Sequence, residues 1–310
     1  MAHTFPVLVL GQVLIGIGCA PAFLVCTVSI ARHFPPERFA SVSGMTMGVG
    51  SVGMLLTGTP LAWLVDTTSW RAGFIALAIC SLGAWLLMAW KVHEPPIAQA
   101  PAPSMWEALK SYGALFALPH TLGILALASV TYASFISLRG LWLGPLLVER
   151  HGFSLVESGN IALIVSVVGL VGPPLFGRLD PGPATRRRWI IGFTVCVAGG
   201  FLLMAVAPTA WIDVGVMLAV GVLSGYIVLQ YADTKAAYPP EMAGRALALF
   251  TMAMFLGVAA MQWLTGVVAS VAKAQGLDPF VAVLLTIAGL LAAGAVAFTC
   301  LPRPPKAGAP

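Results

Sequence analysis

The sequence predicts an all-α, polytopic membrane protein with nine transmembrane helices. Of its 310 residues, 59% are apolar and only 9% carry a charge, and the mean hydropathy is +0.95. A water-soluble domain has roughly a quarter of its residues charged. Long apolar runs need a hydrocarbon solvent, and their backbone amides must be satisfied within each segment. The composition therefore excludes a cytosolic enzyme, a nucleic-acid-binding protein and a disordered chain.

Nine apolar windows of about 20 residues, the length that crosses about 30 Å of hydrocarbon, mark the expected spans. They cover residues 6–30, 40–65, 72–91, 119–147, 157–177, 189–207, 210–232, 244–271 and 279–301. The first window lacks the basic leading segment of a signal peptide, so it is interpreted as a spanning helix. Because nine is an odd number, the two termini are expected on opposite sides of the membrane.

The lysines and arginines predict the orientation, because cytoplasmic loops carry most of them. If the connection after the first span is cytoplasmic, twelve of the sixteen cations lie on that side. Arg71, Arg150 and Lys273 lie on the other side, and Arg139 falls within a span. We therefore expect Met1 outside and Pro310 in the cytoplasm.

An internal repeat relates the first and seventh spans. Phe34-Pro35-Pro36-Glu37 follows the first span, and Tyr238-Pro239-Pro240-Glu241 follows the seventh, 204 positions later. Parallel repeats of six helices are a known transporter architecture. Spans one to three then pair with spans seven to nine, which leaves spans four to six without partners. We expect a duplicated ancestor of twelve spans, of which this chain begins at the fourth; a chance echo of four residues is the alternative.

Three further motifs resemble the major facilitator superfamily. Residues 12–20 (QVLIGIGCA) keep Gly16 and Gly18 of that family's fourth helix. Residues 31–38 (ARHFPPER) and 69–74 (SWRAGF) look like its helix 4 to 5 loop and its helix 5 to 6 turn. The resemblance covers nearly the whole chain and implies that the nine spans are family helices 4 to 12.

The resemblance and the repeat together predict the domain organisation. The longest polar connection contains prolines that forbid a continuous helix, so it divides two helical bundles. The expected parts are a partial amino-terminal bundle (1–92), a cytoplasmic linker (93–117), a six-helix carboxyl-terminal bundle (118–301) and a cytoplasmic tail (302–310). A start codon assigned too far downstream, a truncated gene and a genuinely short protein are the alternative explanations for the absent helices.

The family's proton-antiporter motif is only partly present. Thr57 replaces a glycine in the helix 5 pattern that Gly44 and Gly53 begin, and Gln12 stands where the family's fourth helix commonly has an arginine. These departures weaken a proton-antiport assignment. Coupling to protons, to sodium or to an exchanged solute stays open.

The connection between spans five and six resembles the superfamily's acidic and basic loop signature. Residues 177–180 (GRLD) precede the run Arg186, Arg187 and Arg188. Asp180 is expected to pair with Arg186 or Arg187 at the cytoplasmic face and to stabilise one conformation, as a gating contact. The alternative is that these arginines merely follow the positive-inside rule.

Arg139 is the strongest candidate for solute binding. A cation within a span costs about 3 kcal/mol on insertion scales, so such residues usually face a cavity or a partner. Gly140, Trp142 and the pair Gly144-Pro145 follow it and should loosen the helix. We expect Arg139 to bind an anion or to gate the central cavity. The alternative is outward snorkelling or pairing with a carboxylate such as Asp213.

Four other polar side chains within the spans are expected to bind the solute with Arg139. They are Tyr132, Asn160, Tyr226 and Gln262. Ser166, Gln230 and Tyr231 are weaker candidates for the same cavity. The alternative for each is an interhelical hydrogen bond.

No motif for catalysis, a metal or a cofactor stands out. The five cysteines lie in apolar stretches without a CxxC pair, and neither an ATP-binding loop nor an HExxH element occurs. We expect no cofactor, no metal and no catalytic residue, so that any transport draws on a gradient.

The predicted function is secondary active transport of a small solute by alternating access, with an organic anion favoured if Arg139 faces the cavity. The expected location is a bacterial plasma (inner) membrane, and the expected partners are the solute and the bilayer, without nucleic acid. The alternative is a non-transporting scaffold or solute sensor, in which a partner chain covers the groove that the absent helices leave. A membrane-embedded enzyme is the least supported class.

Overall fold

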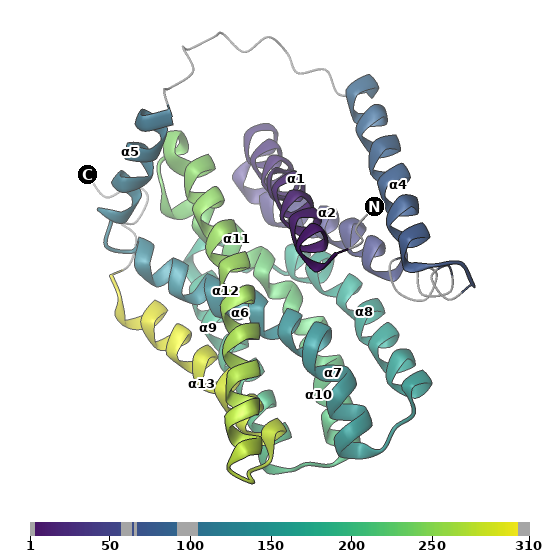
Figure 1. Cartoon of the computed structure of the whole chain (residues 1–310). Coiled ribbons are helices and arrows are strands. Elements are labelled where there is room, and N and C mark those ends of the chain that lie inside the picture. Colours follow the sequence, from purple (N-terminus) through teal and green to yellow (C-terminus); the bar gives the residue numbers. More distant parts are fainter. Residues whose placement is uncertain (1–3, 57–63, 65–66, 92–104, 303–310) are drawn as a thin grey trace.

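The computed structural model describes residues 4–56, 64, 67–91 and 105–302, and all regular structure in this part of the chain is helical (Figure 1). The amino-terminal helices are α1 (Phe5–His33), α2 (Pro36–Leu56) and α4 (Trp70–Lys91), and α5 (Met105–Phe116) follows. The remaining long helices are α6 (Thr121–Ser137), α8 (Leu155–Arg178), α9 (Pro183–Val206), α10 (Ala210–Leu223), α11 (Ile227–Ala237), α12 (Pro240–Ala274) and α13 (Pro279–Cys300). An all-α fold is therefore confirmed for the described residues.

Seven helical segments of the described residues are long and apolar enough to cross a membrane, where nine were expected. They correspond to the third through ninth expected spans, from Trp70–Lys91 to Pro279–Cys300. Within α1, the apolar stretch Pro6–Cys19 is shorter than a spanning segment. The second expected span, 40–65, includes residues 57–63 and 65, which lie outside the described part. In addition, α2 begins with charged Glu37 and Arg38, which lower its hydropathy.

The expected linker, residues 93–117, is partly helical. Helix α5 occupies its second half, whereas residues 92–104 lie outside the described part of the chain. The carboxyl-terminal bundle then begins at Thr121. Helix α4 borders α1 near its start, around a pocket that both helices line, and lies away from the carboxyl-terminal bundle (Figure 1). Nearly all of its side chains are exposed, as suits a lipid-facing helix.

The fourth expected span is loosened close to Arg139. Two π-helical segments, η1 (Leu138–Trp142) and η2 (Leu146–Arg150), flank the three-residue α7 (Leu143–Pro145). A π-helix contains an extra residue in the turn and is often found at functional sites. The glycines and the proline that predicted this loosening lie within these segments.

The seventh expected span is interrupted and longer than predicted. A 3₁₀ turn, η3 (Ser224–Tyr226), separates α10 from α11, because Gly225 packs directly against the backbone of Gly172 in α8. Glycine permits this approach since it has no Cβ. The helix then continues to Ala237 rather than ending near residue 232, so it includes Asp233 and Lys235.

Helix α6 lies at the centre of the carboxyl-terminal bundle, where it packs against α12 and α13. At the α6–α12 crossing, Gly257 lies against the backbone of Ser129. Fully buried apolar side chains such as Phe201, Leu247 and Leu291 fill the core between the helices. Small residues at helix crossings allow the close approach on which packing in a membrane depends.

The amino-terminal helices join this bundle mainly through α2 and α8. Gly44 and Gly48 of α2 face Pro173 and Pro174 of α8, and Gly177 of α8 faces the backbone of Ala40. Pro173 and Pro174 are inside α8, so two backbone amides there cannot donate to the helix. This interface places the end of α1 and the start of α2 beside the end of α8, the end of α11 and the start of α12.

Candidate functional site: a cavity between two groups of helices

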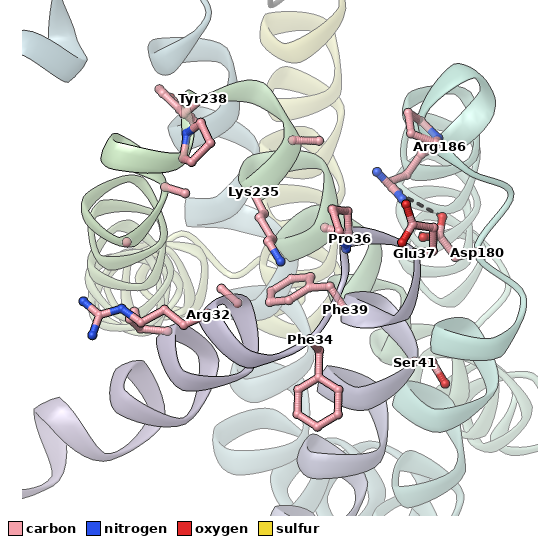
Figure 2. Close-up of a pocket in the computed structure, with 18 of the residues that line it drawn as sticks. Arg32, Phe34, Pro36, Glu37, Phe39, Ser41, Asp180, Arg186, Lys235 and Tyr238 are labelled. Carbon is pink, nitrogen blue, oxygen red and sulfur yellow. Dashed lines mark hydrogen bonds and ion pairs between the residues drawn. The ribbon is translucent and has the colours of Figure 1, made fainter. Parts of the chain in front are cut away.

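A cavity of about 1040 Å³ lies where the amino-terminal helices meet the carboxyl-terminal bundle (Figure 2). Its walls come from the end of α1, the start of α2, the α8–α9 connection, the end of α11 and the start of α12. A small-molecule site usually occupies about 300–1,000 Å³. The cavity is therefore large enough for a small solute with its water.

The two copies of the repeat form matching corners of this cavity. Phe34 ends α1 in extended backbone (φ −116°, ψ 143°), and Tyr238 ends α11 in nearly the same conformation (φ −128°, ψ 153°). A proline, Pro36 or Pro240, then begins the next helix, where its missing N–H costs nothing. Phe34 and Tyr238 both line the cavity. The sequence repeat is thus also a structural repeat.

The wall of the cavity is rich in charge and carries more cations than carboxylates. The carboxylates are those of Glu37, Asp180 and Glu241. The cations are Arg32, Arg178, Arg186, Lys235 and Arg245. A cleft with one dominant sign of charge between low-dielectric walls concentrates oppositely charged solutes. The excess of positive charge therefore favours anions.

Asp180 and Arg186 form the ion pair that the loop signature predicted. The guanidinium of Arg186 donates from Nε to Oδ1 (2.9 Å) and from Nη2 to Oδ2 (2.5 Å) of Asp180 (Figure 2). The Gly182 amide also donates to Asp180 Oδ1. Arg186 is buried, with 5% of its surface exposed, so this bidentate pair fixes the α8–α9 connection firmly.

Arg187, the second predicted gating arginine, reaches the far end of α13. It donates from Nη2 to the Phe298 carbonyl (2.8 Å), and its guanidinium lies 4.0 Å from the centre of the Phe298 ring. The neighbouring Arg188 is exposed. Three consecutive arginines therefore have three different environments.

Two charged groups near the cavity, one buried and one half-buried, were missed by the sequence interpretation. Asp233 of α11 is 8% exposed and lies within electrostatic range of Arg187 and Arg186. Lys235 places its ammonium 4.4 Å from the centre of the Phe39 ring of α2. Both lie just past the predicted end of their span. Their position in the sequence could have revealed them, because Asp233 and Lys235 follow Gln230 closely enough to continue the same helix.

Tyr238 and His120 form a buried aromatic contact behind the cavity wall. Their ring centres are 4.9 Å apart, and the Tyr238 hydroxyl donates to Thr121 Oγ1 (2.9 Å). Burial raises the pKa of Tyr238, although its hydrogen bond to Thr121 opposes this. Burial lowers the pKa of His120, and the nearby Arg187 acts in the same direction against a bond to the Ala237 backbone. His120 is therefore a neutral group of the fold at neutral pH.

Arg139 lies between α6 and α8, half-buried, and it does not line the cavity of Figure 2. Its Nε donates to Ser166 Oγ of α8 (2.8 Å). Asp213, the carboxylate considered as its partner, instead accepts from His151 and faces Arg150. The structure thus joins Arg139 to Ser166, one of the weaker candidates in the sequence.

The other four predicted solute ligands are dispersed. Tyr132 packs edge to face against Phe255 of α12, Asn160 is exposed on α8, and Gln262 is half-buried on α12. Tyr226 is buried and its hydroxyl lies 2.9 Å from Thr194 Oγ1. None of the four lines the cavity of Figure 2. The bond of Tyr226 is of the interhelical kind that was considered as the alternative.

Comparisons with known proteins agree with the fold. The family model of the Major Facilitator Superfamily matches residues 1–261. The crystal structure of the human organic anion transporter MFSD10 (TETRAN) matches with a TM-score of 0.64 over 89% of this chain and 67% of that one. At 17% identity, this likeness shows the fold alone.

Two bacterial proteins are similar in sequence. The hexuronate transporter of Bacillus subtilis (strain 168) is 26% identical over 211 residues, which are 65% of this chain and 44% of that protein. The probable sulfoacetate transporter SauU of Cupriavidus necator is 26% identical over 217 residues, which are 65% of this chain and 50% of that protein. The chain therefore spans about half the length of these curated relatives. Together with the family match, these findings show that the chain belongs to the Major Facilitator Superfamily, a family of membrane transporters.

Proposed function

We propose that this chain acts as a secondary active transporter of a small organic anion by alternating access. In this proposal α1, α2 and α4 are family helices 4 to 6 of a partial amino-terminal bundle, and the helices from α6 to α13 are family helices 7 to 12. The parts are those expected from the sequence: 1–92, 93–117, 118–301 and 302–310. Solute binds between the two bundles, which rock to expose it to each side of the membrane in turn.

The observation that carries the proposal is the charged cavity between the two groups of helices. Five cations and three carboxylates line it. One cation, Arg186, is already paired with Asp180, yet the remaining wall still carries more positive than negative charge. Such a wall raises the local concentration of an anion and lowers that of a cation.

The named solutes of similar proteins support an anion. Hexuronate and sulfoacetate are both carboxylates, and MFSD10 is described as an organic anion transporter. These solutes belong to those proteins, and for this chain they serve as the first compounds to examine.

Arg139 is the proposed anion ligand deeper within the bundle. Arg139 Nε donates a hydrogen bond to Ser166 Oγ, and this bond orients the two Nη atoms of the guanidinium. Arg139 lies within the π-helical segment η1, and such segments are frequent at functional sites. Tyr132, Asn160, Tyr226 and Gln262 remain proposed ligands in states of the cycle other than this one.

The orientation follows from the distribution of cations. The cavity end carries most of the arginines and lysines, so we place it and the carboxyl terminus in the cytoplasm. A bacterial inner membrane is the proposed location.

Uptake by the purified chain in liposomes tests this function. Labelled glucuronate and sulfoacetate are the probes, and glucose is the neutral control. We expect uptake of an anion well above that of protein-free liposomes and no uptake of glucose. Arg139→Gln should reduce anion uptake at least about tenfold, because the negative charge of the solute then lacks the guanidinium that would pair with it. Arg188→Gln, which removes an exposed cation outside the cavity, should behave as the wild type.

Two results would contradict the proposal. Equal uptake by Arg139→Gln and the wild type would remove Arg139 from the solute path. Saturable anion binding without any uptake would favour the solute sensor.

A further inference from the structure

A charged cluster joins four elements at the end of the bundle opposite the cavity. Arg150, the last residue of η2, places Nη1 3.6 Å from Asp213 Oδ2 and Nη2 3.5 Å from Asp278 Oδ2. The next residue, His151, places Nε2 2.6 Å from the same Asp213 oxygen. Asp213 belongs to the first turn of α10, and Asp278 caps α13. Arg150 also donates to the Met204 carbonyl of α9.

Three of the four side chains in the cluster are almost completely buried. The Asp213 side chain is completely buried, and those of His151 and Arg150 are 8% and 9% exposed, whereas Asp278 is 44% exposed. Asp213 Oδ1 is buried without a hydrogen-bond partner among the described residues. A buried carboxylate oxygen without a donor is costly while the group is charged.

The charges of the cluster balance only when it holds one proton. Its permanent charges are one guanidinium and two carboxylates, which leave a net charge of about −1 while His151 is neutral. Among the described residues that are near the cluster in the sequence, Glu149, Glu157 and Lys273 have exposed side chains, and Glu157 is held by the Ser154 cap. One proton shared between His151 Nε2 and Asp213 Oδ2 makes the cluster neutral, and the short distance suits a charge-assisted hydrogen bond.

We propose that His151 and Asp213 form a proton-binding site that holds η2 against α10 and α13 at this end of the carboxyl-terminal bundle. The proton comes from water on that side and binds without any heavy-atom bond being made or broken. When it is bound, the neutral cluster ties η2, α10 and α13 together. When it is lost, a buried negative charge remains, and the site is relieved by opening to water.

The helix that carries Arg150 is suited to such a movement. Its last five residues, Leu146–Arg150, are π-helical, and they end directly at the cluster. π-helical segments of this kind are frequent at functional sites within α-helices. The cluster lies within the carboxyl-terminal bundle at the end opposite the cavity, so release of η2 would loosen this bundle where solute leaves or enters on that side. The predicted consequence is that acid on this side of the membrane slows transport. This consequence rests on the proposed transport function.

Glucuronate uptake into liposomes at fixed internal pH and varied external pH tests the proposal. In chains inserted with the cluster end outward, wild-type uptake should slow as the external pH falls through the midpoint of the site. His151→Gln should remove this slowing, so that uptake at acid pH is several-fold faster than in the wild type. Glu149→Gln, which removes an exposed carboxylate next to Arg150, is the matched control and should keep the wild-type profile.

Asp278→Asn gives a second variant that preserves the fold. Asparagine still caps α13, but the substitution removes one of the two carboxylates, so the cluster is neutral without a proton. The midpoint should therefore move to lower pH, by up to about 1 unit, the low end of the effect of a nearby charge. A merely structural role would lower the rate equally at every pH and leave the midpoint in place.

Melting temperatures of the same variants as a function of pH give a readout that needs no solute. The wild type should lose stability relative to Asp278→Asn as the pH rises, and it should keep a constant difference from Glu149→Gln. Unchanged uptake midpoints and parallel melting curves in His151→Gln and Asp278→Asn would overturn the proton site while transport stands. Absence of uptake by the wild type would contradict the proposed function, and the melting curves would then decide the proton site alone.

Discussion

Phe34 and Tyr238, 204 positions apart in the chain, end α1 and α11 in the same extended backbone and line one cavity (Figure 2). Each is followed by two prolines and a glutamate. The extended residue and the proline at the helix start together turn the chain sharply back into the membrane. The cavity is thus bordered by two copies of one structural unit, which agrees with a duplicated architecture.

The cavity cations should set the affinity for an anion. Arg245→Gln is expected to raise the KM for glucuronate several-fold with little change in kcat, because it removes long-range attraction in the ground state and the transition state alike. The effect should shrink as salt is added, since exposed charges are screened. Uptake kinetics at low and high salt measure both. The same KM change in Arg188→Gln, outside the cavity, would contradict a role for this wall.

The Asp180–Arg186 pair should stabilise the α8–α9 connection. Asp180→Asn leaves a buried guanidinium with a weaker partner, and we expect a loss of about 2 kcal/mol, somewhat below the value for a fully buried pair. Thermal unfolding in detergent measures it. Arg188→Gln serves as the control, because surface substitutions usually change stability by less than about 0.5 kcal/mol. Equal melting temperatures for the two variants would show that the pair is not a stabilising contact.

Close packing at the α6–α12 crossing should make Gly257 sensitive to size. A Cβ at Gly257 would collide with the backbone of Ser129, whereas a Cβ at Gly266, in the same helix, would meet nothing. Gly257→Ala is therefore expected to destabilise the fold by about 1–3 kcal/mol through overpacking. Gly266→Ala should be neutral or stabilising. If both variants melt at the same temperature, the crossing is looser than the structure has it.

His120 should make stability fall in acid. Its pKa is lowered in the folded chain by burial, so the unfolded chain, with an ordinary value near 6.5, takes up the proton first. The contribution to stability is full above about pH 6.5 and is lost as the pH falls toward the lowered folded value. Melting temperatures from about pH 8 to 5 should drop less in His120→Gln than in the wild type. His33→Gln, at an exposed histidine, is the control and should follow the wild type.

Hydropathy predicted the helices well where the windows were long and uniform. The third through ninth expected spans are all present as apolar helices. The end of α11 was missed because Asp233 and Lys235 are charged and a hydropathy window stops at such residues. They are tolerated because Asp233 lies near Arg187 and Lys235 lies over the Phe39 ring, and both partners come from other helices.

The candidate site could be predicted only in part, because many of its contacts join residues from different helices. Asp180 and Arg186 are six positions apart, so local sequence was enough to pair them. Asp213 was matched with Arg139, the one cation inside a span, yet it binds His151, which follows the span. A sequence pattern cannot tell which side of a helix faces which neighbour, and so it assembled Tyr226 and Asn160 into one cavity although one is buried and the other exposed.

The central claim is that anions occupy the cavity between the two groups of helices, and the labelling rate of a single cysteine tests it most directly. Ser41→Cys places a thiol in the cavity wall, and Ser81→Cys places one on exposed α4, in a background where the five native cysteines are replaced by serine. The account predicts that glucuronate slows the labelling of Ser41→Cys in a saturable way, that glucose does not, and that neither changes the labelling of Ser81→Cys. Labelling of Ser41→Cys at one rate with and without a transported anion would contradict it.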